Sequence, residues 1–156
     1  MTYDTSPVPG EQQTDQIAVS TQELLELLEQ ASQLEPFLEE YGGSMNAPTF
    51  AQYLADLLER RGLTTTRLSE LSLLSRSFTY QLCSGVRVPS RDIVLRLAIV
   101  LNLRVEECQQ MLRSAQRGVL YPKVRRDAVV IFALNRQLSI SDTDEMLRTL
   151  GEAPLL

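Results

Sequence analysis

The sequence contains no histidine and no tryptophan, and only two of its 156 residues are cysteines. Without histidine, acid–base catalysis by imidazole and the histidine-dependent triads are excluded. The cysteines do not form a paired metal-binding motif, and no glycine-rich phosphate-binding motif is present. We therefore expect no enzyme, no metal site and no cofactor.

Long apolar runs are also missing. No segment approaches the ~20 apolar residues that cross a membrane, and the polar stretch at residues 1–20 does not resemble a signal peptide. We therefore expect a cytoplasmic protein without a membrane partner. Cys83 and Cys108 lie on predicted helices and are interpreted as small core residues, although a nearby arginine could lower the pKa of Cys83.

Basic residues are absent from the first third of the chain. Residues 1–49 contain nine Asp or Glu and no Lys or Arg, whereas residues 50–118 contain ten Arg and six Asp or Glu. Residues 119–156 contain five charges of each sign. The acidic pI of about 4.8 therefore does not argue against nucleic acid, because the central block is basic.

The N-terminal third predicts a tail and an acidic helical arm. Residues 1–19 are polar and carry proline, so we expect a disordered tail. Ser20 and Glu23 form a capping-box pattern that opens an amphipathic arm at residues 20–41, with a boundary or kink at Pro36. This arm either docks on the protein or a dimer partner, or competes with DNA for the basic block. Residues 42–48 are a linker by composition.

The stretch at residues 63–89 has the layout of a helix-turn-helix. Two short helical patterns, at residues 65–72 and 76–84, flank a break at residues 73–75. Ser75 suits the N-cap of the second helix, and Gly85 suits its end. Further helices are predicted over residues 50–61, 91–101 and 105–116, which gives a five-helix, all-α domain at residues 49–118.

The segment LTTTRLSELSLLSRSFTYQLCSGVRVPSRDIVLRLAIVLNLRVEEC resembles the Xre/lambda-repressor-like helix-turn-helix family. The match extends over about residues 49–112. Three positions depart from the family pattern: Ser69 replaces an alanine, Leu73 replaces a glycine of the turn, and Thr79 replaces an isoleucine. A positive φ at Leu73 would strain the turn.

The C-terminal extension, residues 119–156, is similar to that of small Xre-type proteins of Gram-positive bacteria, described as proposed transcriptional regulators. The shared segment is LYPKVRRDAVVIFALNRQLSISDTDEMLRTLGEAPL. Residues 125–137 predict a well-buried helix, with a strand as the alternative. Ser141 is expected to cap a last helix at residues 142–150, with Asp142, Asp144 and Glu145 in its first turn. The extension is interpreted as a lid on the bundle or as a dimer interface.

The resemblance implies that the helix at residues 76–84 enters the major groove of double-stranded DNA. It places five residues toward the bases: Arg76, Ser77, Phe78, Tyr80 and Gln81. Arg76 could bind guanine, Gln81 adenine, and Phe78 a thymine methyl group. Five others are expected at phosphates: Thr65, Thr66, Arg87, Ser90 and Arg91. Four to six phosphate contacts would make binding steeply salt-dependent.

Two functions are open at this point. The first is a sequence-specific DNA-binding transcriptional regulator of the Xre type, acting as a homodimer on two half-sites. The second is a protein-interaction module that keeps the helix-turn-helix fold and acts through its acidic helix on a regulatory partner. Phosphorylation could control it at a group of hydroxyl residues: Thr64, Thr65, Thr66, Ser75, Ser77 and Thr79.

Overall fold

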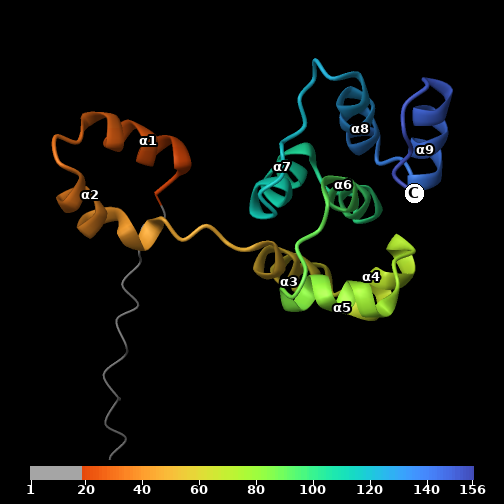
Figure 1. The fold of residues 1–156 in the computed structure, drawn as a ribbon, viewed down its shortest axis with the longest axis horizontal. Coiled ribbons are helices and arrows are strands. Elements are labelled where there is room, and N and C mark those ends of the chain that lie inside the picture. The colour runs from red at the N-terminus through yellow and green to blue at the C-terminus, as the bar shows by residue number, and fades with distance from the viewer. Residues whose placement is uncertain (1–18) are drawn as a thin grey trace, which may run out of the picture. The chain divides into compact units, whose positions relative to one another are not determined.

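The described part of the chain, residues 19–156, is built from nine α-helices and one short 3₁₀ helix and contains no strand (Figure 1). The structure is a computed structural model. It confirms the all-α fold class. The chain divides into two compact units, Met1–Asn46 and Ala47–Leu156, which we describe separately. The tail predicted at residues 1–19 lies outside the described residues, except for Val19.

Helix α1 (Thr21–Gln30) opens the first unit with the predicted capping box. Ser20 Oγ accepts from the Glu23 N–H at 3.2 Å, and the Glu23 carboxylate accepts from the Ser20 N–H at 2.9 Å.

The boundary predicted at Pro36 is wrong, because α2 (Leu34–Tyr41) begins before this proline. Pro36 lies in the first turn, where a missing N–H breaks no helical hydrogen bond. A 3₁₀ turn, η1 (Gly42–Ser44), occupies the start of the predicted linker.

The part of the first unit that the structure describes, residues 19–46, has almost no core of its own. Phe37 is the only buried side chain of α1 and α2, and its ring lies 5.0 Å from the ring of Tyr41. Four leucines of the two helices are between 42 and 58% exposed: Leu25, Leu28, Leu34 and Leu38. The described part of the unit is acidic, so an apolar surface and six glutamates share one pair of helices.

Five helices form the core of the second unit: α3 (Phe50–Arg61), α4 (Thr65–Ser72), α5 (Arg76–Ser84), α6 (Arg91–Val100) and α7 (Val105–Ser114). The bounds of α4 and α5 are those predicted, and α7 ends two residues before the predicted Gln116. Gly62 ends α3 with a φ of 63°, which glycine adopts without strain. Their inward residues form one apolar core that includes Leu54, Leu57, Leu68, Leu82, Val94, Leu97, Met111 and Leu112.

The C-terminal segment forms α8 (Arg125–Arg136) and α9 (Ile140–Thr149). Residues 125–136 are therefore a helix, and the alternative of a strand is excluded. The helix is less buried than predicted, because Phe132 is 44% exposed and its ring lies 4.9 Å from the Arg136 guanidinium carbon. The predicted cap of α9 is also wrong: Ser139, not Ser141, accepts from the Asp142 N–H, at 3.0 Å.

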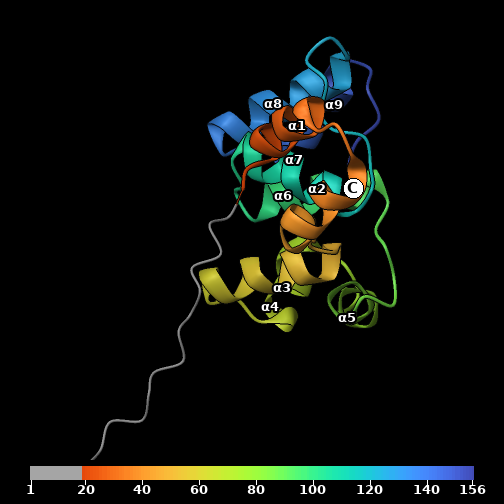
Figure 2. The same ribbon diagram turned by 90° about the vertical axis from the view of Figure 1, so that its left-hand side faces the viewer.

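Helices α8 and α9 pack on α6, on the side opposite to α4 and α5 (Figures 1 and 2). Val130 of α8 and Leu147 of α9 join the same apolar core as the first five helices. This packing agrees with the interpretation of the extension as a lid. A dimer interface formed by it stays a prediction.

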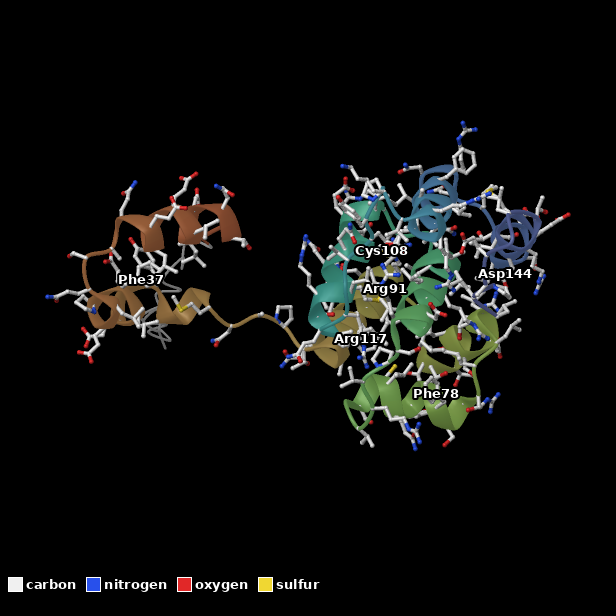
Figure 3. All side chains as sticks on the ribbon, turned by 45° about the horizontal axis from the view of Figure 1, so that its top comes forward. Phe37, Phe78, Arg91, Cys108, Arg117 and Asp144 are labelled. Carbon is white, nitrogen blue, oxygen red and sulfur yellow. The ribbon has the colours of Figure 1, made fainter. Side chains whose placement is uncertain are left out.

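The environment of Asp144 differs from the one predicted, which was the first turn of the last helix. Its side chain is buried (Figure 3), and its carboxylate accepts from the N–H groups of Leu155 and Leu156, at 2.6 and 3.0 Å. A buried carboxylate requires such donors. Asp144 therefore holds residues 155–156 against α9 rather than facing the N-terminal dipole of this helix.

Candidate nucleic-acid interface

Helices α4 and α5 pack against each other and are joined by three residues, Leu73 to Ser75. Each helix begins at a hydroxyl cap: Thr64 accepts from the Arg67 N–H and Ser75 from the Phe78 N–H, both at 3.1 Å. Gly85 ends α5 with a φ of 82°. The helix-turn-helix predicted from the sequence is present.

Three side chains hold the turn by donating to backbone carbonyls. Ser69 Oγ donates to Leu74 O at 2.7 Å, and Ser72 Oγ donates to Leu68 O at 2.7 Å. Arg96 Nε, from α6, donates to Ser72 O at 2.6 Å. The Ser72 carbonyl ends α4 and lacks a partner within the helix, so Arg96 supplies its donor, whereas the two serine hydroxyls bind Leu74 O in the turn and Leu68 O within α4. The hydroxyl of Ser69, which departs from the family's alanine, thus has a structural role.

Leu73 adopts the positive φ that was considered when its position was compared with the glycine of the family. Its φ is 59° and its side chain is 67% exposed. The Cβ makes this conformation costly, and an exposed side chain gains little from packing. Leu73→Gly is therefore expected to raise the free energy of unfolding by about 0.5–1 kcal/mol, after subtracting the entropy cost of glycine.

Chemical denaturation of the full chain measures this effect. Leu73→Ala is the matched control, since it removes the same exposed side chain but retains the Cβ, and we expect it to stay within about 0.5 kcal/mol of the parent. A glycine variant less stable than the alanine variant would contradict the strain argument.

Helix α5 turns one face inward and the other outward. Thr79 and Leu82 are fully buried, and Thr79 Oγ1 donates to Ser75 O at 2.8 Å, which satisfies the hydroxyl in the core. Of the residues expected at the bases, Arg76, Ser77 and Tyr80 are exposed, and Phe78 and Gln81 are partly buried. Thr79 is consequently not accessible to a kinase, in contrast to the expectation from the sequence.

Phe78 contributes to the protein's own packing. Its ring contacts the apolar core, and the Arg87 guanidinium carbon lies 5.6 Å from the ring centre. Figure 3 labels Phe78, which lies on α5. The ring is thus shared between the core and Arg87, so it is less available to a thymine methyl group than the sequence suggested.

The residues expected at phosphates fall into two groups. Thr65 and Thr66 lie in the first turn of α4, Arg87 is exposed in the loop after α5, and Ser90 caps α6 by accepting from the Ile93 N–H at 3.3 Å. Arg91 differs, because Asp127 of α8 binds its guanidinium through two hydrogen bonds of 2.9 and 2.8 Å. Arg91 also donates to the carbonyls of Gly118 and Val119.

The Arg91–Asp127 pair is buried on the carboxylate side, since the Asp127 side chain is only 5% exposed. Burial opposes ionisation of Asp127, but hydrogen bonds from Arg91 and the Tyr121 N–H outweigh it and lower the pKa of this carboxyl. In a second ion pair between the same two helices the arginine lies on α8 and the carboxylate on α6: Arg126 binds Asp92 at 2.7 Å. Arg91 is thus engaged within the protein rather than presented to a phosphate.

Most of the central arginines are engaged in the same way (Figure 3 labels Arg91 and Arg117). Seven of the ten in residues 50–118 donate to a carboxylate or carbonyl of the second unit: Arg60, Arg61, Arg67, Arg91, Arg96, Arg104 and Arg117. On α5 and its following loop, Arg76 and Arg87 make no ion pair with the described residues. The number of arginines can be read from the sequence, but the carboxylates and carbonyls that bind them cannot.

Sequence reasoning missed the positioning role of Arg96 and of Asp127. A signal existed for Arg96, since it is the single charge within the apolar run from Ile93 to Val100, and such a residue needs a buried partner. No comparable signal existed for Asp127, whose partner is remote in sequence.

The thiols carry no catalytic signature. Burial raises the pKa of Cys108 to about 12. Burial also raises the pKa of Cys83, and a hydrogen bond with Thr65 offsets only part of this rise, so the suggestion that an arginine lowers it is wrong. Within residues 19–156, no cluster of carboxylate, cysteine or histidine side chains could hold a metal ion. None of the helices seen there is long and apolar enough to span a membrane.

Comparison with known proteins agrees with this geometry. Residues 49–110 match the model of a family described as a helix-turn-helix domain. The match contains α3 to α6 and most of α7. No curated protein and no solved structure matches the chain.

Proposed function

We propose, from the helix-turn-helix domain at residues 49–110, that the chain is a sequence-specific DNA-binding transcriptional regulator of the Xre type. The carrying observation is α5, whose outward face combines Arg76, Ser77 and Tyr80 without any acidic residue. In this arrangement the helix lies in the major groove with its first turns at the bases. Arg76 would bind guanine through two hydrogen bonds, and Gln81 would pair with adenine.

The phosphate contacts would come from a small set of groups. The N–H groups and hydroxyls of Thr65 and Thr66 begin α4, where a helix N-terminus favours an anion. Arg87 and Ser90 would bind a second phosphate beyond α5. Arg91 supports this site indirectly, because it fixes the start of α6 to α8.

A homodimer is part of this proposal. One helix-turn-helix reads few base pairs, so two copies would read half-sites about one DNA turn, ~34 Å, apart. The glutamates of α1 and α2 would repel those of a second copy, so the C-terminal extension, where Phe132 of α8 and Leu150 after α9 are exposed, is the better candidate for contact between the copies.

The salt dependence of DNA binding tests the proposal. Arg87 and the α4 N-terminus would neutralise about two phosphates, so log K should fall with log salt with a slope of about −2 per protomer. Ten arginines at phosphates would give about −9. The measurement is a titration on pooled random duplexes, for the full chain and for a chain starting at Ala47, where the second unit begins.

Each outcome of this titration has a different meaning for the proposal. Binding by both chains supports the regulator, and binding by the shorter chain alone adds an inhibitory role for residues 1–46. Absence of binding by both, at low salt, would contradict the DNA-binding proposal.

A second candidate function has a specific observation in its favour. The leucines of α1 and α2 are exposed beside six glutamates, and Phe37 alone is buried. A surface of this kind suits a basic partner protein with an apolar groove. If DNA is not bound, this interaction module becomes the preferred function.

A further inference from the structure

The loop between α5 and α6 carries Arg87 and Ser90, the two residues that we propose at a phosphate. Its first part has few contacts of its own, because every residue from 85 to 88 is exposed. One hydrogen bond ties it to α5, from the Arg87 N–H to Gln81 O at 3.1 Å. The position of Arg87 and Ser90 therefore depends on what holds this loop where it enters α6.

The end of the loop is held from outside the helix-turn-helix, by Arg117. Arg117 Nε donates to the carbonyl oxygen of Pro89, a buried residue, at 2.9 Å. In return, the Arg91 side chain donates to the carbonyl oxygens of residues 118–119, at 2.9 and 3.1 Å. Three hydrogen bonds thus join the two segments, and they lie on both sides of Ser90.

Arg117 is itself fixed to the core through the end of α7. Gln116 has a φ of 56°, and the N–H of Arg117 donates to Leu112 O at 2.9 Å, the pattern of a helix that ends with a left-handed residue. Leu112 is fully buried. The side chain of Arg117 therefore reaches the loop from a rigid helix end, and the family match, which stops at residue 110, does not include it.

We infer that Arg117 is a positioning residue for the phosphate site of Arg87 and Ser90, so that the DNA-binding unit extends beyond the family match to Arg117. This inference rests on the proposed DNA-binding function. Arg117 acts through the loop and not on the DNA. Without its donor the Pro89 carbonyl loses its hydrogen bond, and the loop no longer holds Arg87 and Ser90 at one phosphate.

The test is a double-mutant cycle of Arg117→Met and Arg87→Ala in the full chain, titrated with pooled random duplexes over a range of salt concentrations. The parent slope is expected at about −2 per protomer, and each single variant should lose the loop phosphate and show about −1. A fourfold rise in salt then weakens the parent about 16-fold and each variant about fourfold. The double variant should match the single variants, because both changes remove the same contact.

Two further variants separate positioning from loss of charge. Arg113→Met removes the same charge from an exposed residue of α7, and it should keep the parent's slope and affinity. Arg117→Lys retains a donor of similar reach, and it should bring the slope back toward −2. Because Arg117 is exposed, all of these variants should unfold at nearly the denaturant concentration of the parent.

Four results would overturn the inference. The parent's slope and affinity in Arg117→Met would show that the loop does not depend on Arg117. A slope near zero in the double variant would show that Arg117 binds a phosphate of its own. Unfolding of Arg117→Met without denaturant would make its role structural alone. Failure of the parent to bind at low salt would contradict the DNA-binding function itself, and this result requires no variant.

Discussion

Replacing Asp127 by alanine is expected to lower the free energy of unfolding by about 3–5 kcal/mol, the typical cost of removing one partner of a buried ion pair. The Asp127 carboxylate is buried and binds both the Arg91 guanidinium and the Tyr121 N–H. Its loss leaves the Tyr121 N–H and Nη1 of Arg91 without an acceptor, although Nε and Nη2 of Arg91 still donate to the carbonyls of Gly118 and Val119. Chemical denaturation of the full chain measures the change.

Asp92→Ala is the matched control. Asp92 forms the reciprocal pair with Arg126 across the same two helices, but its side chain is 49% exposed, against 5% for Asp127. Arg126 also donates to Ala153 O, so it keeps an acceptor in this variant. We expect a loss of about 1 kcal/mol or less. Equal losses for the two variants would show that burial of the carboxylate does not determine the effect.

The Arg91–Asp127 pair also makes the stability of the fold depend on pH in the acid range. The pKa of Asp127 in the folded protein lies below the ordinary value of an aspartate, so the folded state binds this proton more weakly than the unfolded state. The contribution of the pair to stability is thus complete above the unfolded pKa and is lost as the pH falls through the folded pKa. Asp127→Asn should lack this part of the acid unfolding curve.

Arg76→Ala is expected to have the largest effect on sequence preference. Arg76 is the single charged residue of α5, is exposed and begins the helix that would enter the major groove. A two-pronged arginine–guanine contact supplies about 1–3 kcal/mol of discrimination, which corresponds to roughly 5- to 150-fold. The variant should lose this preference for the selected site while its binding to random duplexes falls much less.

The measurement compares a site selected by the parent with the same site changed at the guanine. Arg148→Ala is the control, because Arg148 is exposed near the end of α9, on the other side of α6 from the reading helix. It should keep the parent's preference. Undiminished discrimination by the Arg76→Ala chain would show that another residue reads the base.

The bounds of α4 and α5 were predictable because their signals are local. Thr64 and Ser75 satisfy the first amides of each helix, and Gly85 ends α5 in a left-handed conformation. The cap of α9 shows how such reasoning fails. Both Ser139 and Ser141 are residue types that cap helices, and Ser139 with Asp142 also has the spacing of a capping box.

The interface was less predictable because it depends on partners remote in sequence. The composition of residues 50–118 suggested a basic surface, but the structure pairs Arg91 with Asp127 and Arg96 with Ser72 O. The burial of α8 was overestimated for a related reason. An apolar sequence shows that Phe132 can be buried, whereas the position of its neighbours determines whether it is.

The division of the chain at Asn46 and Ala47 also separates its charge by sign. All nine acidic residues of the first unit precede the first basic residue, Arg60, and residues 47–156 carry 15 basic and 11 acidic side chains. The isoelectric point of the whole chain therefore describes neither unit. An anion-exchange resin should retain the intact protein, whereas the second unit alone should bind to a cation exchanger. Trypsin, which cleaves after lysine and arginine, has no site before residue 60.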